Sequence, residues 1–111
     1  MNRVTFRVTE KLFGTVALML VLVVSTRADD SAALYKAKCA YCHGTDGHGD
    51  TPVTKKMGVR DFASPEVQKE TDKELIDITT KGKNKMPGYE NMLTKSQIKD
   101  LVTYIHALGK K

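Results

Sequence analysis

Apolar residues recur at helical spacing near the C-terminal end of the chain. The series is Ile98, Leu101, Val102, Ile105 and Leu108. This spacing is the stripe of an amphipathic helix that buries one face. Thr94–Gln97 has the pattern of a capping box, Leu93 stands where a hydrophobic staple would reach Ile98, and Gly109 follows the stripe. The pattern therefore predicts a terminal amphipathic helix that Gly109 closes.

Two shorter helices are predicted from their N-terminal signals. Thr71–Glu74 is a second capping box, and the apolar residues after it continue to a stop near Gly82. Ser64 followed by Pro65 is an N-cap with proline at the first helical position, which predicts a helix of about one or two turns.

A further helix is expected at Asp30–His43, where alanines and a leucine follow capping candidates at Asp29, Asp30 and Ser31. The glycine- and proline-containing segments 44–58 and 82–91 are predicted to be loops. Because no alternating apolar run is long enough for a strand, the predicted fold class is all-α.

The N-terminal end has the pattern of an export signal. Leu12–Val24 is a run of 13 apolar or small residues, with Arg3, Arg7 and Lys11 before it and Ala28 at a small-residue cleavage site after it. A helix of that length reaches roughly 20 Å, short of the ~30 Å hydrocarbon core of a membrane. We therefore expect residues 1–28 to be a signal peptide and residues 29–111 to form one exported domain. Membrane contact is expected only if the leader stays uncleaved.

Removal of the leader changes what the charge indicates. The 111-residue chain has a formal net charge of +5, which falls to +2 when the leader's four cations and one acid are removed. So small a charge argues against nucleic-acid binding. The chain also lacks a phosphate-binding loop and a nucleophile elbow, so no small-molecule substrate is indicated. A domain of 83 residues usually needs a disulfide, a metal or a cofactor to supplement its core.

The chemistry is concentrated in Cys39-Ala40-Tyr41-Cys42-His43. On a helix, residues three and four apart lean toward one side, so both sulfurs and the imidazole converge. This arrangement suits a haem, whose two vinyl groups accept the thiols as thioethers while the histidine reaches the iron, and the pentapeptide is the motif of c-type haem attachment. The predicted cofactor is therefore one covalently attached haem c, with Cys39, Cys42 and His43 as binding residues.

Three other interpretations of the cysteines stay open. A Cys39–Cys42 disulfide is permitted in an exported protein, but it would stabilise little and would not explain His43. A zinc site would need a fourth ligand from His48 or His106, neither of which has a familiar spacing. A thioredoxin-like redox pair would need a βαβ context, which the pattern lacks.

The other face of the haem needs a ligand, and the mature chain offers three methionines. Met86 is favoured because it stands in an irregular loop beside Pro87, whose ring fixes one backbone angle. Met92 and Met57 rank behind it, since a methionine more often fills a gap in the core than binds a metal. The predicted metal ligands are therefore His43 and Met86.

Taken together, these features resemble a small bacterial class I c-type cytochrome. The resemblance covers residues 29–111 and rests on the order of a helix ending in Cys-x-x-Cys-His-Gly, a glycine-rich loop, middle helices, Lys-Met-Pro-Gly-Tyr and a terminal helix. It implies three to five helices wrapped around one covalently bound haem, with the first and last helices packed together.

The resemblance also implies particular contacts. The packing of the first helix on the last would bring Leu34 or Ala37 near Leu101, Tyr104 or Ile105. A proline carbonyl would accept the imidazole N–H of the proximal histidine, with Pro52 as the candidate. No tryptophan is available beside the haem propionates, so another group must pair with them.

Ligation by histidine and methionine leaves the iron no open position, so we expect a soluble one-electron carrier between larger redox complexes, not an enzyme. A periplasmic or otherwise exported location follows from the leader. The alternative is a haem enzyme or gas sensor with an open distal side. Lys81, Lys83 and Lys85 either dock redox partners or belong to a solvated loop, and the sequence does not decide between these two roles.

Overall fold

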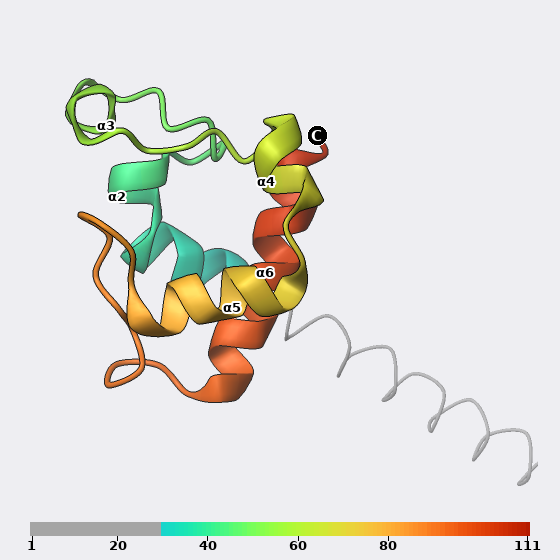
Figure 1. Cartoon of the computed structure of the whole chain (residues 1–111). Coiled ribbons are helices and arrows are strands. Elements are labelled where there is room, and N and C mark those ends of the chain that lie inside the picture. The colour runs from blue at the N-terminus through green and yellow to red at the C-terminus, as the bar shows by residue number, and fades with distance from the viewer. Residues whose placement is uncertain (1–29) are drawn as a thin grey trace, which may run out of the picture. The chain divides into compact units, whose positions relative to one another are not determined.

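The computed structural model describes residues 30–111, which form helices, turns and one isolated bridge but no strand. The predicted leader and Asp29 lie outside the described residues. A helix over residues 30–38 is followed by α2 (Ala40–His43), α3 (Pro52–Met57), α4 (Pro65–Lys69), α5 (Asp72–Lys81) and α6 (Lys95–Gly109) (Figure 1). The all-α prediction is confirmed for this part of the chain.

The three predicted N-caps that lie in the second half of the domain are confirmed. The hydroxyls of Ser64, Thr71 and Thr94 each accept a hydrogen bond from a backbone N–H in the first turn of α4, α5 and α6. Both threonines form the reciprocal capping box that the sequence predicted. Caps of this kind each stabilise a helix by about 1 kcal/mol, because they satisfy N–H groups that otherwise lack a partner.

The predicted loop over residues 44–58 is wrong in its second half, which forms α3. Thr51 caps this helix in a capping box with Thr54, Pro52 occupies its first turn, and Gly58 ends it with a φ of 68°. Thr51-Pro52 is the same signal as Ser64-Pro65. The glycines around this signal led to the prediction of a loop. Gly58 is compatible with the helix, because it ends the helix as its C-cap.

The predicted first helix differs from the observed one in two ways. Asp30 and Ser31 are already helical, so neither is the N-cap. The helix is also interrupted by a turn at Cys39, whose φ of −117° departs from helical geometry, before α2 continues to His43. At the other end of the domain, Gly109 is the last residue of α6, and Lys110 is its C-cap.

The core is built on the apolar stripe of α6. Ile98, Leu101, Val102 and Ile105 are buried, as predicted. Leu93 and Ile98 belong to the same hydrophobic cluster, in agreement with the expected staple.

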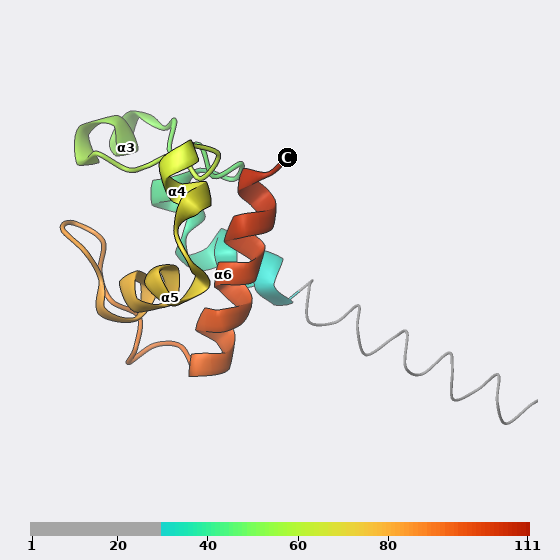
Figure 2. The same ribbon diagram turned by 45° about the vertical axis from the view of Figure 1, so that its right-hand side comes forward.

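The helix over residues 30–38 packs against α6, and the two segments lie together in both views (Figure 2). The contact that joins them is made by Tyr35, which is 1% exposed and whose ring centroid lies 5.2 Å from that of Tyr104. Of the two residues expected to take part in this packing, Leu34 borders the core, whereas Ala37 is exposed. None of the helices within residues 30–111 combines the length and apolar character that a membrane crossing requires.

Candidate functional site

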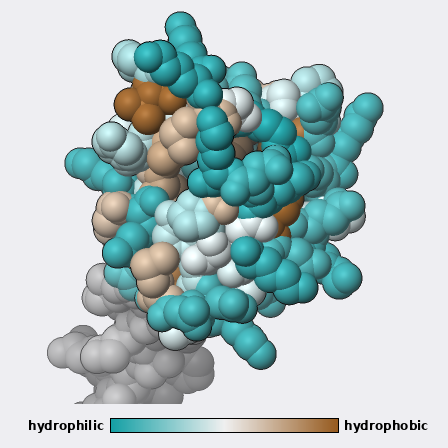
Figure 3. Space-filling view, turned by 60° about the vertical axis from the view of Figure 1, so that its left-hand side comes forward, coloured by the Kyte–Doolittle hydropathy of each residue, from teal (hydrophilic) through white to brown (hydrophobic). Residues whose placement is uncertain are grey.

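A cavity of about 250 Å³ brings together residues from both halves of the domain. Cys39, Cys42, His43 and Met86 all line it, although His43 and Met86 are 43 residues apart in the sequence. Apolar side chains from α4, α5 and α6 make up much of the remaining wall: Val67, Leu75, Ile78, Leu101 and Ile105. Figure 3 brings forward the side on which α3 and the 82–91 segment lie, where apolar groups interrupt a mostly hydrophilic surface.

The cavity lining distinguishes some of the three methionines that were considered as iron ligands. Met92 is 55% exposed and does not line the cavity, so it is placed away from the predicted site. Met57, in α3, does line the cavity, as does Met86.

Cys39 and Cys42 are half-buried and are not joined to each other in a disulfide. Burial, together with the neighbouring Cys42 sulfur, raises the pKa of the Cys39 thiol to about 11. A thioredoxin-like pair works through a thiol of lowered pKa, so this environment does not favour that interpretation. A neutral, partly buried Cys39 thiol at the wall of the cavity is compatible with the attachment of a largely apolar group such as a haem.

His43 is held by side-chain packing. Its ring stacks on Phe62 with the centroids 4.6 Å apart and the planes inclined by 24°. Burial, and then the positive charge of Arg60, lower the pKa of His43, so the imidazole is neutral at pH 7 and able to bind a metal. Its Nδ1 atom is buried and has no hydrogen-bond partner. The expectation that Pro52 accepts this N–H is therefore wrong, because Pro52 begins α3 instead.

Met86 is held by the backbone around it. Lys83 N–H donates to the Met86 carbonyl at 3.1 Å, and Met86 N–H donates to the Lys83 carbonyl at 3.0 Å. Asn84, in the turn between them, has a φ of 54°. Past the methionine, Tyr89 N–H donates to the Thr79 carbonyl in α5 at 3.0 Å. The Tyr89 hydroxyl donates to the Lys38 carbonyl at 3.1 Å, which ties this loop to the residue before Cys39.

The zinc interpretation finds no support in the described residues. Within residues 30–111 there is no group of three or more His, Cys, Asp or Glu side chains that could hold a metal ion. His48 pairs with Asp61 and His106 pairs with Asp72, in both cases with nitrogen and oxygen 2.9 Å apart.

Three residues at or near the site were not identified from the sequence. Tyr35 lies four and seven residues before the cysteines, so helical spacing could have placed it on their face. Its hydroxyl donates to the Gly44 carbonyl at 2.7 Å, directly after the His43 segment. Phe62 and Arg60 lie in a segment without periodicity, and no local signal points to them.

Comparison with known proteins agrees with this arrangement. Residues 26–105 match the family described as cytochrome c oxidase, cbb3-type, subunit III. The chain belongs to this family of c-type cytochromes. A covalently bound haem c and electron transfer through it are therefore properties of the family to which this cytochrome belongs.

Two known proteins resemble the cytochrome at a similar level. It is 31% identical over 97 residues to the cbb3-type cytochrome c oxidase subunit CcoP of Azospirillum brasilense, covering 80% of this chain but only 33% of that protein. The solved structure of the KustC0563 c-type cytochrome matches with a TM-score of 0.65 and 31% identity, covering 70% of this chain and 95% of the other. The fold is thus that of a small class I c-type cytochrome.

The residues around the cavity suit a haem. The cavity presents two thiols and an imidazole from one segment and the thioethers of Met57 and Met86 from two others, against an apolar wall. The described residues that line it include four cations and no Asp or Glu, which is a favourable setting for a macrocycle that carries two carboxylates. The cations are Lys38, Arg60, Lys83 and Lys85.

Proposed function

We propose that this cytochrome is a one-electron carrier whose single haem c is attached to Cys39 and Cys42 and ligated by His43 and Met86. The observation that supports this most strongly is the convergence of these four residues on one mainly apolar cavity. Bound haem supplies a centre that takes up and releases one electron.

Each residue has a distinct task in this proposal. Cys39 and Cys42 supply the sulfur atoms of the two thioether bonds. His43 offers a neutral imidazole, whose orientation is restricted by the stack on Phe62. Met86 would supply a sulfur ligand to the iron, and a methionine ligand raises the reduction potential relative to a second histidine. If His43 and Met86 both bound the iron, no position would remain for a substrate, so we propose a carrier and not an enzyme.

The redox partners are proposed to be larger complexes, in keeping with the name of the CcoP relative. We propose that residues 1–28 direct export to the periplasm, that residues 29–111 are the mature cytochrome domain, and that the protein stays membrane-anchored if the leader is retained. Because the chain spans about a third of that relative, assembly into an oxidase is not part of the proposal.

Mass and absorption spectra of the purified protein test the proposal. After acid-acetone extraction and denaturation, the polypeptide should keep the mass of haem, because thioethers survive where coordinate bonds do not. The native protein should be low-spin with a weak far-red sulfur-to-iron band. High-spin haem would instead support the enzyme or gas-sensor alternative, and a bare polypeptide mass would exclude haem c. The same mass measurement shows whether residues 1–28 are removed.

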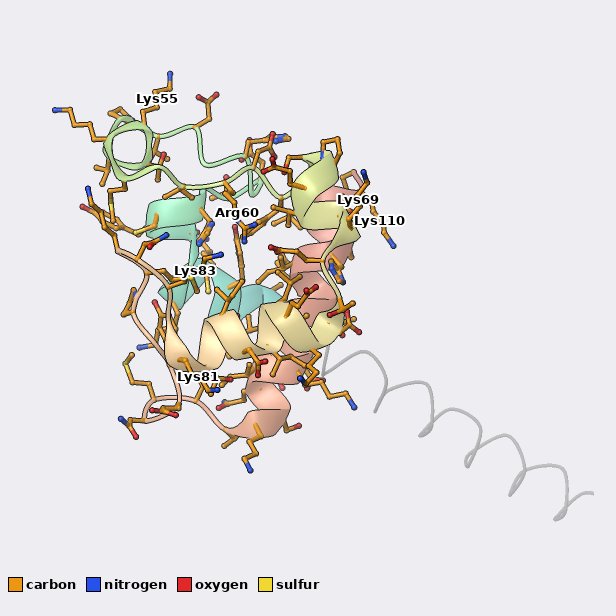
Figure 4. All side chains as sticks on the ribbon, viewed as in Figure 1. Lys55, Arg60, Lys69, Lys81, Lys83 and Lys110 are labelled. Carbon is orange, nitrogen blue, oxygen red and sulfur yellow. The ribbon has the colours of Figure 1, made fainter. Side chains whose placement is uncertain are left out.

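Docking of the partners is proposed to use the lysines around the Met86 loop. Lys83 and Lys85 are exposed and border the cavity, and Lys81 is exposed in the last turn of α5 (Figure 4). If they guide an acidic partner, electron transfer should slow as rising salt shortens the Debye length below ~10 Å. The variant Lys83→Gln/Lys85→Gln should slow it at low salt, with Lys110→Gln as the control. If the rate of electron transfer changes neither with salt nor with these substitutions, the lysines belong to an ordinary solvated loop.

A further inference from the structure

The two nitrogens of the His43 ring have different surroundings. His43 lines the cavity, and its Nδ1 atom is buried without a hydrogen-bond partner in the part of the chain that the structure describes. Nε2 is therefore the nitrogen that faces the cavity. A metal-binding histidine almost always donates its other ring N–H to an acceptor, and this hydrogen bond sets the orientation of the ring. Among residues 30–111, no protein group accepts such a bond from His43.

The charged neighbour of His43 does not provide this acceptor. The positive charge of Arg60 acts on His43, but a guanidinium only donates hydrogen bonds and accepts none. Its Nη1 and Nη2 atoms donate to the two carboxylate oxygens of Glu70, at 2.7 and 3.1 Å. The rotation of an imidazole about its Cβ–Cγ bond has only a broad intrinsic preference. The orientation of the His43 ring must therefore come from packing.

Phe62 supplies a flat surface against the His43 imidazole. The two ring centroids are 4.6 Å apart, and the ring planes are inclined by only 24°. Phe62 is buried and also lines the cavity. Because the rings are nearly parallel, rotation of the imidazole about its Cβ–Cγ bond would drive its edge into the phenyl ring. The stack therefore restrains the rotation that a hydrogen bond from Nδ1 would otherwise restrain.

Phe62 is itself held at its backbone and at its ring. Its N–H donates to the Gly47 carbonyl at 3.0 Å, and its carbonyl accepts a hydrogen bond from the Gln68 side-chain amide at 2.7 Å. Tyr35 meets the phenyl ring edge-on, with the centroids 6.4 Å apart and the planes inclined by 63°. These contacts come from three separate segments of the chain, so the position of Phe62 is determined by the folded domain.

Two glycines allow this close packing around Phe62. A Cβ placed on Gly47 would lie 2.6 Å from Cδ2 of the phenyl ring. A Cβ placed on Gly109, in the last turn of α6, would meet the Phe62 carbonyl and the Gln68 amide nitrogen. Figures 1 and 2 both show α4 beside this end of α6. The last turn of α6 therefore supports Phe62 from the side of the backbone.

We propose that Phe62 is the positioning residue that sets the plane of the His43 imidazole, in place of a hydrogen bond from Nδ1. Gln68 and the last turn of α6 hold Phe62 for this task. The inference rests on the proposed function, since it concerns His43 as a ligand of the haem iron. It goes beyond that function by assigning the orientation of this ligand to an aromatic stack and to the C-terminal helix.

Electron paramagnetic resonance of the oxidised holoprotein tests the proposal, because the g values of low-spin ferric haem depend on the plane of an axial imidazole. Phe62→Leu keeps an apolar side chain but removes the flat ring. Its largest g value should shift, and the line should broaden as the imidazole adopts a wider range of orientations. Phe62→Tyr keeps the ring and should restore the g value of the wild type.

A second variant acts on Phe62 without any change at the cavity wall. Gln68 does not line the cavity, and Gln68→Met removes its hydrogen bond to the Phe62 carbonyl. The largest g value should shift by less than in Phe62→Leu. Lys69→Met is the matched control, because it places the same side chain at the next, exposed position of α4 and should leave the g values unchanged. If Phe62→Leu does not fold with haem, this pair decides the question.

Ile98→Ala separates positioning from a general loss of core packing. Ile98 is buried in the same hydrophobic cluster as Phe62 but does not line the cavity. This variant should unfold at a lower temperature and keep the g values of the wild type. A g value unchanged in Phe62→Leu, or one shifted as far in Ile98→Ala, would overturn the proposal.

These outcomes are distinguishable from failure of the proposed function. A variant that keeps its low-spin haem but does not show the expected g values contradicts only the role of Phe62. A wild type that is high-spin or lacks haem contradicts the His43 and Met86 ligation before any variant is compared.

Discussion

The two sides of the cavity position their key residues by different means. His43 is oriented by side-chain packing, because its ring stacks on Phe62 and the segment that follows it is fastened by the buried Tyr35 hydroxyl at the Gly44 carbonyl. Met86 is positioned by the backbone, because reciprocal hydrogen bonds with Lys83 set the turn that carries it. Lys83, Asn84 and Lys85 of that turn are exposed.

A close approach of two backbone segments fixes the Met86 loop to α5. Gly82 has a φ of 81°, and a Cβ placed on it would lie 2.6 Å from the Met86 carbonyl oxygen and 2.7 Å from Gly88 N. Only glycine allows this approach without displacement of the loop. The histidine side therefore depends on aromatic side chains, whereas the methionine side depends on glycine and on main-chain hydrogen bonds.

The largest expected effect comes from removal of the methionine itself. In Met86→Ala the sulfur-to-iron band should disappear, the reduced form should bind carbon monoxide, the potential should fall, and the unfolding midpoint should decrease. In the proposed site the iron–sulfur bond would close a loop of 43 residues onto His43, so its loss should free the C-terminal half from that constraint.

Two control variants locate the ligand. Met92→Ala should change little, because Met92 is exposed. Met57→Ala should keep the low-spin spectrum and leave at most a small cavity. If Met57→Ala abolishes the band while Met86→Ala retains it, the assigned ligand is wrong, although the carrier function would stand.

The second prediction tests the backbone control of the methionine side. Gly82→Ala should destabilise the protein by about 2–4 kcal/mol and weaken the sulfur-to-iron band, because the φ of 81° and ψ of 167° at Gly82 lie in a region essentially restricted to glycine and because the added Cβ overpacks the loop. Gly58→Ala is the matched control, since Gly58 has a φ of 68° but nothing within 4 Å of the added Cβ. It should cost only the strain, about 1–2 kcal/mol, and leave the band intact. Denaturant unfolding and absorption spectra measure both effects, and equal losses in the two variants would contradict the close-approach argument.

The third prediction concerns the contact that links the two sides. Tyr89→Phe removes the hydrogen bond to the Lys38 carbonyl and should cost about 1 kcal/mol of unfolding free energy. The sulfur-to-iron band should also be lost at lower denaturant than in the wild type. Tyr41→Phe provides the control, since Tyr41 is 77% exposed. A Tyr89→Phe protein as stable as Tyr41→Phe would show that the link does not hold the sides together.

The smallest effect concerns a titratable pair on the histidine side. The hydrogen bond and negative charge of Asp61 raise the pKa of His48 above its ordinary value, while bonds from Ala63 N–H and His48 lower the pKa of Asp61. A raised histidine pKa adds stability at pH values below about 6.5, and this contribution is lost as pH rises through the pKa of the folded state. A lowered aspartate pKa adds stability above about pH 3.9, which is lost on acidification.

NMR titration of the imidazole measures this pair. Asp61→Asn should bring the pKa of His48 back toward about 6.5 and leave the sulfur-to-iron band unchanged. Because both groups are exposed, the effect on unfolding should be small. An unaltered His48 pKa in the variant would show that Asp61 is not its partner in solution.

Several features of the molecule were determined by the sequence alone. The caps at Ser64, Thr71 and Thr94 and the apolar stripe of α6 depend on hydrogen bonds and spacings within three or four residues, so they could be predicted in place. The Cys-x-x-Cys-His motif is equally local, and its five residues are enough to indicate the haem. Two local features were missed: α3, because its threonine–proline signal stands among glycines, and the turn at Cys39 that interrupts the first helix.

The tertiary structure decided what depends on residues far apart in the chain. Phe62 meets His43 across 19 residues and Tyr89 reaches Lys38 across 51, and no spacing rule connects such positions. Arg60 and Glu70 stand in segments without periodicity, and only the folded chain brings Arg60 to the cavity wall. Burial and electric fields are properties of the packed chain, since they depend on which groups exclude water from which others. The sequence therefore determined the cofactor and the helices, whereas the environment that orients and tunes the site arose from packing.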